Sequence, residues 1–381
     1  MTNIIEKTTL NGMVLKNRMV RSATWEGMCT PEGAPTQKLV DCYQTLAKGG
    51  VGLIISGYSF VRPDGKQLPG KLGIHSDDLA DEMHNLADKV HLAGGKICIQ
   101  LVHAGGQTDS SNAGRQPLAP SALKLEQYPE IPAELTLEEI QAIITAFADG
   151  ARRAKAWGFD AVQLHAAHGY LINQFLSPLS NKRNDIYGGS EENRRRFLLE
   201  TYAAVRAAAG ADYPVLIKLS GDDFLDGGLS SAEAAQAAIE LDLLGIDAIE
   251  VSGGTSASGK RSPVRGRAKT PADEGFHLPL AAHIKKSVNC PVMVVGGLRN
   301  YRQIEESLNS GMADYFSLSR PFIREPDLIN RWLQGDHSPA KCQSCNGCFK
   351  PGLKEGGIYC VKEKMEQEKE QRSESKHQTK I

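Results

Sequence analysis

Two histidines and a tyrosine lie within six residues of one another, at His165, His168 and Tyr170. Imidazole and phenol groups can donate hydrogen bonds to an oxygen that gains negative charge, and a phenol can also give up a proton. The H-x-x-H spacing also occurs in metal sites and in structural histidine pairs. Because these residues lie at the end of the apolar run 159–165, where barrel folds place catalytic side chains, we expect a catalytic cluster.

An amide and a cation lie within two further apolar runs. Gln100 lies in the run 96–102, and Lys218 lies in the run 213–220. If these runs are strands of one sheet, the two side chains could face a planar heterocycle that carries carbonyl and N–H groups. A salt bridge at the strand end is the alternative for Lys218. Both residues are therefore candidates for a cofactor site.

Glycine, serine and arginine follow the last two apolar runs. Gly296 and Gly297 end one run, and Ser319 and Arg320 end the next. In barrels of alternating strands and helices, phosphate is often bound at these two places, by backbone N–H groups and, in this chain, by a guanidinium. A simple tight turn is the alternative for the glycines, but the joint pattern predicts a phosphate site.

Eight short, apolar, β-branched runs would position these side chains. They cover residues 17–24, 51–58, 96–102, 159–165, 213–220, 247–252, 291–297 and 314–319. Segments with helical character lie between them, for example residues 77–93, 136–157, 191–209, 230–244 and 301–310. Eight strands that alternate with helices predict a (β/α)8 TIM barrel. A doubly wound sheet is the alternative, but the sequence contains no G-x-G-x-x-G motif of a Rossmann domain.

The composition limits the partners of the protein. The 381 residues include 44 Lys and Arg and 45 Asp and Glu, and the formal net charge is −1. That balance argues against a bulk attraction to nucleic acid or to an anionic membrane. The first residues do not resemble a secretory signal, and no apolar run is long enough to span a bilayer. We therefore expect a cytoplasmic protein whose partner is a small molecule.

Four of the eight cysteines form a cysteine-rich extension near the C-terminus, with the pattern C-x2-C-x2-C-x11-C. They are Cys342, Cys345, Cys348 and Cys360. Such crowding in a cytoplasmic chain indicates metal binding, and four thiolates suit an iron–sulfur cluster or a structural zinc ion; a vacant site is the third alternative. The sequence thus predicts a barrel (1–335), a metal or iron–sulfur segment (336–362) and a charged, disordered tail (363–381).

The stretch from residue 165 to residue 194, HAAHGYLINQFLSPLSNKRNDIYGGSEENR, strongly resembles the old yellow enzyme family of FMN-dependent oxidoreductases. Shorter stretches resemble the same family at residues 15–24, 51–55, 99–103 and 319–321. The resemblance covers about residues 5–335. It implies a (β/α)8 barrel that holds FMN and reduces the activated C=C bond of α,β-unsaturated carbonyl compounds with hydride from NADH or NADPH.

The resemblance assigns a set of residues to the cofactor. They are Ser22, Ala23, Thr24, Tyr58, Gln100, Lys218, Gly296, Gly297, Ser319 and Arg320. The backbone of the first three would line the flavin ring, and Gln100 would bind its pyrimidine edge. Many relatives carry Arg at the position of Lys218, and either cation would stabilise the reduced flavin. Gly297, Ser319 and Arg320 would hold the phosphate.

The same resemblance assigns the substrate side of the site. His165 and His168 would bind the carbonyl oxygen of the substrate, and Tyr170 would deliver a proton to its α-carbon. These three would be the catalytic residues. Trp25 departs from the family pattern, because better-studied members often have Cys, Thr or His directly after the flavin-lining segment. A bulky indole there would narrow the substrate pocket or alter the flavin potential.

Relatives that resemble 2,4-dienoyl-CoA reductase and 2-enoate reductase carry a [4Fe-4S] cluster after the barrel, with a middle cysteine spacing one residue longer than in this chain. They continue into a half that binds FAD and NAD(P)H, which this sequence does not show before residue 381. One alternative is therefore an FMN barrel fed by a partner reductase through an iron–sulfur cluster. Others are an amine dehydrogenase or demethylase and a non-enzymatic metal-binding module. Since family members often form dimers or tetramers, a homo-oligomer is also an expectation.

Overall fold

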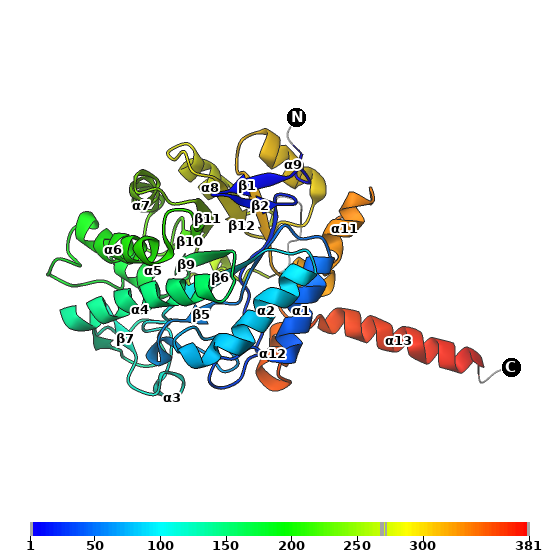
Figure 1. Ribbon diagram of the computed structural model, residues 1–381, viewed down its shortest axis with the longest axis horizontal. Coiled ribbons are helices and arrows are strands. Elements are labelled where there is room, and N and C mark those ends of the chain that lie inside the picture. The colour runs from blue at the N-terminus through cyan, green and yellow to red at the C-terminus, as the bar shows by residue number, and fades with distance from the viewer. Residues whose placement is uncertain (1–2, 267–269, 271–272, 379–381) are drawn as a thin grey trace.

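Eight parallel strands pair side by side and close into a barrel in the computed structural model, which describes residues 3–266, 270 and 273–378 (Figure 1). The strands are β3 (Met19–Arg21), β4 (Leu53–Ile55), β6 (Ile97–Val102), β9 (Ala161–Ala166), β10 (Val215–Ser220), β11 (Ala248–Ser252), β12 (Val292–Val295) and β13 (Tyr315–Leu318). Closure occurs at β4, which pairs with β3 on one side and with β6 on the other. The predicted TIM barrel is confirmed, and each strand lies within or one residue beyond its predicted run.

Helices surround the barrel and connect its strands (Figure 1). They are α1 (Gln37–Lys48), α2 (Ala80–Leu92), α4 (Leu137–Ala156), α6 (Glu191–Ala209), α7 (Ser231–Leu243), α8 (Leu278–Lys285), α9 (Tyr301–Asn309), α10 (Arg320–Arg324) and α11 (Leu328–Leu333). The helices predicted from the sequence are all present. Two of them, α4 and α7, begin with capping boxes at Thr136 and Ser230, which explains why their starts are readable from the sequence.

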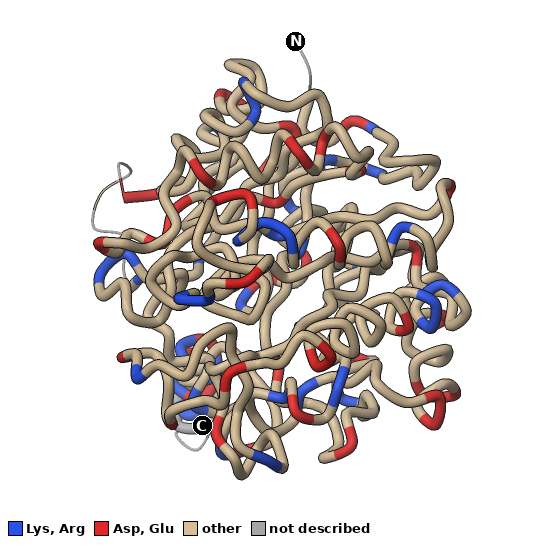
Figure 2. Tube along the Cα trace, turned by 90° about the vertical axis from the view of Figure 1, so that its left-hand side faces the viewer, with Lys and Arg blue, Asp and Glu red and all other residues tan. Residues whose placement is uncertain are grey.

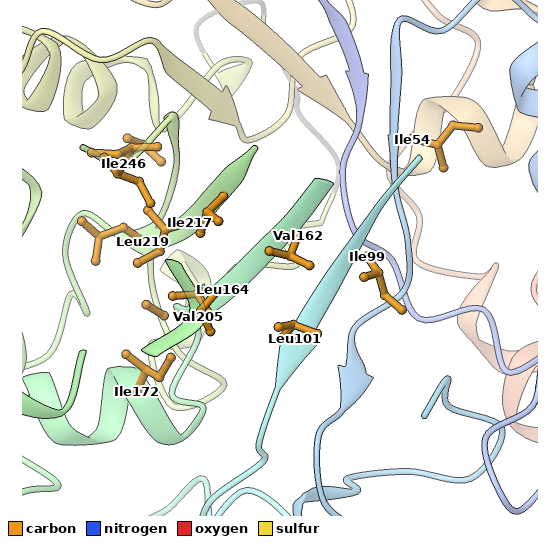
Figure 3. Packing of buried hydrophobic residues seen from close by; sticks show 14 of the residues in the cluster. Ile54, Ile99, Leu101, Val162, Leu164, Ile172, Val205, Ile217, Leu219 and Ile246 are labelled. Carbon is orange, nitrogen blue, oxygen red and sulfur yellow. The ribbon is translucent and has the colours of Figure 1, made fainter. Parts of the chain in front are cut away.

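The strands bury apolar side chains on both faces. On the outer face Leu101, Val162, Leu164 and Ile217 belong to a cluster that also contains apolar residues of the helices (Figure 3). On the inner face a second apolar cluster fills the end of the barrel where the strands begin. Its strand members are Val20, Leu53, Ile55, Cys98, Ala161, Leu216, Ala248, Met293 and Tyr315.

Two residues further along four of these strands, the inner face becomes polar. Because side chains alternate between the faces of a strand, Cys98, Ala161, Leu216 and Ala248 are followed on the inner face by a polar set. That set is Gln100, Gln163, Lys218 and Glu250. All four are buried. The barrel is therefore apolar at its amino end and polar toward its carboxyl end, where the site lies.

A hairpin closes the amino end of the barrel. It consists of β1 (Thr8–Leu10) and β2 (Met13–Leu15), joined by Asn11 and Gly12 with φ of 39° and 77°. An Asn-Gly pair favours this type of tight turn, because both residues tolerate a positive φ. Leu10, Met13 and Leu15 of the hairpin join the inner apolar cluster. The sequence analysis did not predict this element.

Short elements in the loops after the strands cover the carboxyl end of the barrel. Among the described residues they are β5 (Ser59–Phe60), η1 (Pro63–Gly65), η2 (Asp77–Leu79), α3 (Ser110–Ala113), β7 (Leu118–Ala119), β8 (Ala133–Glu134), α5 (Leu171–Leu176) and η3 (Gly259–Arg261). Two long connections, at about residues 104–134 and 253–276, follow β6 and β11. Part of the second connection lies outside the described residues.

The C-terminal segment contains two helices, α12 (Phe349–Lys354) and α13 (Val361–Gln378). Helix α13 extends away from the barrel (Figure 1). Residues 363–378, most of the segment predicted to be a disordered tail (363–381), form part of this helix, and residues 379–381 lie outside the described residues. Glu, Lys and Gln, which dominate this segment, favour helix even where nothing packs against them. A charged composition indicates exposure to water, and exposure does not exclude a helix.

Basic and acidic residues are intermixed along the chain trace in Figure 2. This agrees with the nearly balanced count of acidic and basic residues. Among the described helices, none is both long enough and apolar enough to cross a membrane.

The segment around α12 packs against the loop that follows β3. The Ile358 N–H donates to the Glu26 carbonyl at 2.9 Å. A Cβ on Gly27, whose φ is +68°, would lie 2.6 Å from the carbonyl oxygen of Gly352. A Cβ on Gly352 would in turn lie 2.9 Å from the Trp25 indole. Close backbone contact, which requires glycine at both places, holds the C-terminal segment beside Trp25.

We predict that Gly27→Ala loosens this contact and lowers the melting temperature. The control is Gly227→Ala, since Gly227 has φ of +70° but no atom within 4 Å of an added Cβ. Alanine at a positive φ costs about 1–2 kcal/mol of backbone strain in both variants. Only Gly27→Ala adds a clash with the Gly352 carbonyl. Limited proteolysis should cut Gly27→Ala faster between α11 and α13. Equal melting temperatures and equal cleavage of the two variants would contradict the prediction.

Candidate active site

A cavity of about 440 Å³ opens at the carboxyl end of the barrel. All the residues predicted to bind flavin or substrate line it. They are Ser22, Ala23, Thr24, Trp25, Tyr58, Gln100, His165, His168, Tyr170, Lys218, Gly296, Gly297, Ser319 and Arg320. They come from seven of the eight barrel strands or from the loops that follow them. Parallel strands bring these distant positions together because their carboxyl ends meet at one rim.

A buried ion pair forms the floor of the cavity. The Lys218 ammonium lies 3.2 Å from a Glu250 carboxylate oxygen and donates to the Ser22 hydroxyl at 2.9 Å. The Ser22 hydroxyl donates to the other Glu250 oxygen at 2.8 Å. Burial lowers the pKa of Lys218, and the Glu250 carboxylate opposes that shift. Lys218 is thus held at a fixed place under the cavity with a carboxylate below it.

Two amides extend this network across the barrel. Gln163 donates to Glu250 at 2.9 Å and accepts from the Gln100 amide nitrogen at 2.6 Å. The Oε1 atom of Gln100 is buried and has no hydrogen-bond partner in the structure. An unpaired buried carbonyl oxygen is unfavourable, and an N–H group of a ligand in the cavity would satisfy it. This atom is what a flavin pyrimidine N–H requires, so the residues present fit FMN.

Sequence reasoning missed Gln163 and Glu250. A signal existed, because each is a polar residue in the middle of a largely apolar strand, in AVQLHA and AIEVS. An inward polar residue on a barrel strand needs partners from neighbouring strands.

His165 and His168 are both neutral in this cavity. Burial lowers the pKa of His165 well below its ordinary value, and His168 and Lys218 add to the shift. Burial lowers the pKa of His168 in the same way. Nδ1 of His165 accepts a hydrogen bond from the Ala167 N–H at 3.3 Å, so the ring proton of the neutral form lies on Nε2. That N–H is available to a ligand.

A left-handed turn directs the second imidazole. His168 has φ of 62°, which non-glycine residues seldom adopt, and hydrogen bonds to its backbone hold the turn. The His168 N–H donates to Ser220 at 3.2 Å, and Gln107 donates to its carbonyl at 2.9 Å. Its Nε2 lies 2.7 Å from the Ser252 hydroxyl. The two imidazole rings lie 5.2 Å apart at an interplanar angle of 82°.

Two tyrosines share one acceptor beside the histidines. The hydroxyls of Tyr170 and Tyr58 donate to Oε1 of Gln67 at 2.7 and 2.9 Å. The Tyr170 ring lies 4.7 Å from that of His165 and 5.3 Å from that of Tyr58. Burial raises the pKa of Tyr170, so its hydroxyl keeps its proton at neutral pH. Gln67 was not predicted, because it lies in a loop without a recognisable motif.

The indole of Trp25 forms part of the cavity wall. It is 8% exposed, and its Nε1 donates to the Pro69 carbonyl at 3.2 Å. The C-terminal segment supplies two further wall residues, Ser344 and Phe349, that sequence reasoning did not assign to the site. The part of the chain predicted to hold a metal therefore also shapes the cavity.

The predicted phosphate residues lie together at the far end of the cavity. Gly296 and Gly297 follow β12, and the Ser319 hydroxyl lies 2.6 Å from that of Thr24. Arg320 donates to the Arg265 carbonyl at 2.8 Å and to the Asn346 side chain. These acceptors are neutral, so the guanidinium keeps its charge unbalanced for an anionic ligand.

The four clustered cysteines line a second, small cavity of about 20 Å³. Arg320 borders both cavities. Burial raises the pKa of Cys348 to about 11, and burial likewise raises the pKa of Cys342. Within the described part of the chain, no group of three or more His, Cys, Asp or Glu side chains is arranged to hold a metal ion. The predicted ligand set of Cys342, Cys345, Cys348 and Cys360 therefore stays a prediction.

A protein-family model agrees with this geometry. The NADH:flavin oxidoreductase / NADH oxidase family matches residues 5–337. The chain belongs to this family. Membership agrees with a barrel whose carboxyl end carries a candidate flavin site.

The chain is similar in sequence to several curated proteins. The chain is 39% identical over 332 residues to an NADPH dehydrogenase of Clostridium acetobutylicum, covering 86% of this chain and 93% of that protein. It is 37% identical over 351 residues to an NADH oxidase of Thermoanaerobacter brockii, covering 91% of this chain and 53% of that protein. The chain thus spans about half the length of the second relative.

A solved structure of 2-naphthoyl-CoA reductase in complex with 2-naphthoyl-CoA is also similar. Its TM-score is 0.85 at 27% identity, and the match covers 92% of this chain and 55% of that one. Old yellow enzyme structures are also among the structural neighbours, for example the homologue from Zymomonas mobilis. The resemblance inferred from the sequence motifs is confirmed.

We predict that the free energy of unfolding decreases as the pH falls from 7 to 5. Burial lowers the pKa of His165, His168 and His277, the last to about 4. A histidine in the unfolded chain titrates near 6.5. Below that pH the unfolded state therefore binds more protons than the folded state, which lowers the free energy of unfolding. The slope should reach about 1.4 kcal/mol per pH unit for each histidine.

Urea unfolding with FMN in excess, at several pH values, measures this slope. His277→Asn removes one of the three groups and should make the slope shallower. Identical slopes for the variant and the wild type would show that buried neutral histidines do not cause the effect.

Proposed function

We propose that the protein is an FMN-dependent oxidoreductase that reduces the activated C=C bond of α,β-unsaturated carbonyl compounds, with hydride from NADH or NADPH. The observation that carries the proposal is the convergence of two neutral imidazoles and a protonated phenol in one cavity. A carbonyl oxygen needs hydrogen-bond donors, and the carbon next to it needs a proton. His165, His168 and Tyr170 offer these groups on one side of the cavity.

The floor and the far end of the cavity suit FMN. Ser22, Ala23 and Thr24 would line the ring, and the unpaired oxygen of Gln100 would accept from its pyrimidine edge. When bound, FMN supplies hydride transfer between the nicotinamide and a carbon atom. Lys218 would place a positive charge against the ring, at the point that its ion pair with Glu250 fixes.

The phosphate of the cofactor would lie at the other end. Backbone N–H groups at Gly296 and Gly297 and the guanidinium of Arg320 can bind an anion. Tyr58, which the sequence analysis assigned to the cofactor, lies against Tyr170 and His165 instead. We therefore propose that Tyr58 contributes to the wall around the substrate.

The two histidines act as neutral hydrogen-bond donors in this proposal. Nε2–H of His165 points away from its backbone partner and is free for the substrate oxygen. His165 is buried, so a hydrogen bond from its N–H stabilises negative charge on that oxygen more strongly than it would in solution. Tyr170 then gives its proton to the α-carbon.

The reductant and the enone would use the same cavity in turn. The chain contains no G-x-G-x-x-G motif for a separate nicotinamide domain. NADH or NADPH would bind against the flavin and leave before the substrate enters. The localisation that fits these partners is cytoplasmic, as the sequence analysis expects.

We predict that an anaerobic solution of the purified protein shows flavin absorbance that NADH or NADPH bleaches and 2-cyclohexenone restores. Tyr170→Phe should slow the restoration by at least about a hundredfold, because general acid catalysis contributes at least that much. Bleaching by the nicotinamide should change less than about twofold. Stopped-flow absorbance separates the two steps.

A variant that is equally slow in both steps would contradict the role of Tyr170. A wild-type flavin that the nicotinamide bleaches but no enone restores would contradict the proposed substrate class. An amine that bleaches the flavin would favour the dehydrogenase or demethylase alternative.

Electron supply through the cysteine segment is the second candidate. It is favoured by the position of Arg320, which borders both the main cavity and the small cavity lined by the four cysteines. An iron–sulfur cluster held there would lie beside the phosphate end of the main cavity. In that arrangement a partner reductase would deliver the electrons.

This candidate predicts that anaerobically purified protein contains iron, and that Cys345→Ser loses the iron but keeps FMN. Cys42→Ser is the control, since Cys42 lies on α1, outside the cluster. Metal analysis and absorbance spectra measure both contents. Zinc in place of iron, or equal metal content in the two variants, would contradict the candidate.

A further inference from the structure

A lysine lies buried behind the wall of the main cavity. Lys71 is 2% exposed, and no carboxylate in the described part of the chain forms an ion pair with it. Its ammonium donates to Oε1 of Gln67 at 2.8 Å. It also lies 3.2 Å from the ring centroid of Tyr58 and 5.5 Å from that of Tyr170. Lys71 itself does not line the cavity, so it can act on a ligand only through these neighbours.

Burial without a carboxylate is an unfavourable setting for a lysine. Burial lowers the pKa of Lys71 well below its ordinary value. The amide oxygen and the aromatic faces compensate only part of the lost hydration, since both are weaker partners than a carboxylate. A negative charge that forms near Lys71 would therefore stabilise its buried ammonium group.

The loop that carries Lys71 is firmly placed. Gln67 and Lys71 lie four residues apart between η1 and η2. Gly70, between them, has φ of +65°, and a Cβ there would lie 2.9 Å from the carbonyl carbon of Gly27. The Trp25 indole binds the Pro69 carbonyl in the same loop. The ammonium therefore has a defined position relative to Tyr170.

Three donors converge on the amide oxygen of Gln67. They are the ammonium of Lys71 and the hydroxyls of Tyr58 and Tyr170. A carbonyl oxygen has two lone pairs, so the three donors compete for them. The hydroxyl of Tyr170, at 2.7 Å, shares this acceptor with Lys71 and Tyr58, so it loses less by turning toward a ligand in the cavity than it would from an acceptor of its own.

We propose that Lys71 is a positioning residue for Tyr170, acting through Gln67 and through its charge to favour the proton transfer from Tyr170 to the substrate. This inference rests on the proposed function, in which Tyr170 is the proton donor. In that step the O–H bond of Tyr170 breaks and its electron pair stays on the phenolate oxygen. The C=C electron pair of the substrate enolate forms the new C–H bond at the α-carbon, and the C=O bond is restored. Solvent water later returns the proton.

The charges around Tyr170 agree with this role. The titratable groups that face its ring are His165, Tyr58 and Lys71. Burial lowers the pKa of His165 well below its ordinary value, so Lys71 is the group among these that can place a positive charge beside a phenolate at Tyr170. An opposite charge at about 5 Å stabilises a phenolate substantially in a buried site. The phenolate in turn strengthens the hold of Lys71 on its own proton.

The test is Lys71→Met in the FMN-loaded protein, a substitution that keeps an unbranched side chain only one atom shorter and removes the amino group. Stopped-flow measurements follow bleaching by the nicotinamide and restoration by 2-cyclohexenone. We expect the restoration of flavin absorbance by the enone to slow about tenfold. Loss of an opposite charge near an ionising group commonly shifts its pKa by about one unit, which corresponds to this factor. Bleaching and the KM for the enone should change less than about twofold.

Lys16→Met is the matched control. Lys16 follows β2 at the amino end of the barrel, where it binds the carbonyls of Ala47 and Gly94, and burial also lowers its pKa. Gln67→Met is a second variant for the case that Lys71→Met does not fold, and we expect it to slow the same step. In a Tyr170→Phe background, Lys71→Met should have no further effect, because the group on which it acts is gone.

Three outcomes would overturn the inference. One is unchanged restoration in Lys71→Met and in Gln67→Met while the wild type reduces the enone. Another is equal slowing of bleaching and restoration, or loss of FMN, which indicates a purely structural role. The third is the same loss in the Tyr170→Phe background as in the wild type. A wild type that reduces no enone would instead overturn the proposed function itself.

Discussion

The ion pair between Lys218 and Glu250 is the constraint on which the arrangement of the site depends. Both groups are buried inside a closed barrel, where an unpaired charge would be highly unfavourable. Their pairing in turn requires Ser22 and Gln163 as further partners. Strands β9, β10 and β11 and the residue after β3 therefore keep fixed positions relative to one another, and this fixes where these strands end. The side chains at the rim take their places from this layer.

The barrel and the members of its site could be predicted because strand ends follow from simple patterns. Apolar runs such as those around Val162 and Ile217 mark parallel strands, and the barrel brings their carboxyl ends to one rim. This reasoning placed His165, Tyr170 and Lys218 in one cavity. The Asn11-Gly12 turn was equally readable, and the hairpin was missed only because no apolar run of strand length surrounds it.

The remaining features depend on contacts that no local pattern contains. The stagger of neighbouring strands decides which inward-facing residue forms an ion pair with Lys218. The sequence of β11 alone therefore could not identify Glu250 as that partner. Gln67 and Phe349 come from a loop and from the C-terminal segment, and only the folded chain shows that they reach the cavity. The cysteine spacing indicated a ligand set, whereas the structure adds that this segment packs against Trp25.

The charges at the site follow one rule. Burial lowers the pKa of His165 and raises the pKa of Tyr170, so the imidazole and the phenol that would touch the substrate stay uncharged. Two buried lysines border this layer, Lys218 at the floor and Lys71 behind the tyrosines. Each stands where negative charge would develop during the proposed reaction, one beneath the flavin ring and one beside the proton donor. A neutral inner layer backed by fixed cations lets negative charge form without solvent reorganisation, which is how a buried site lowers a barrier.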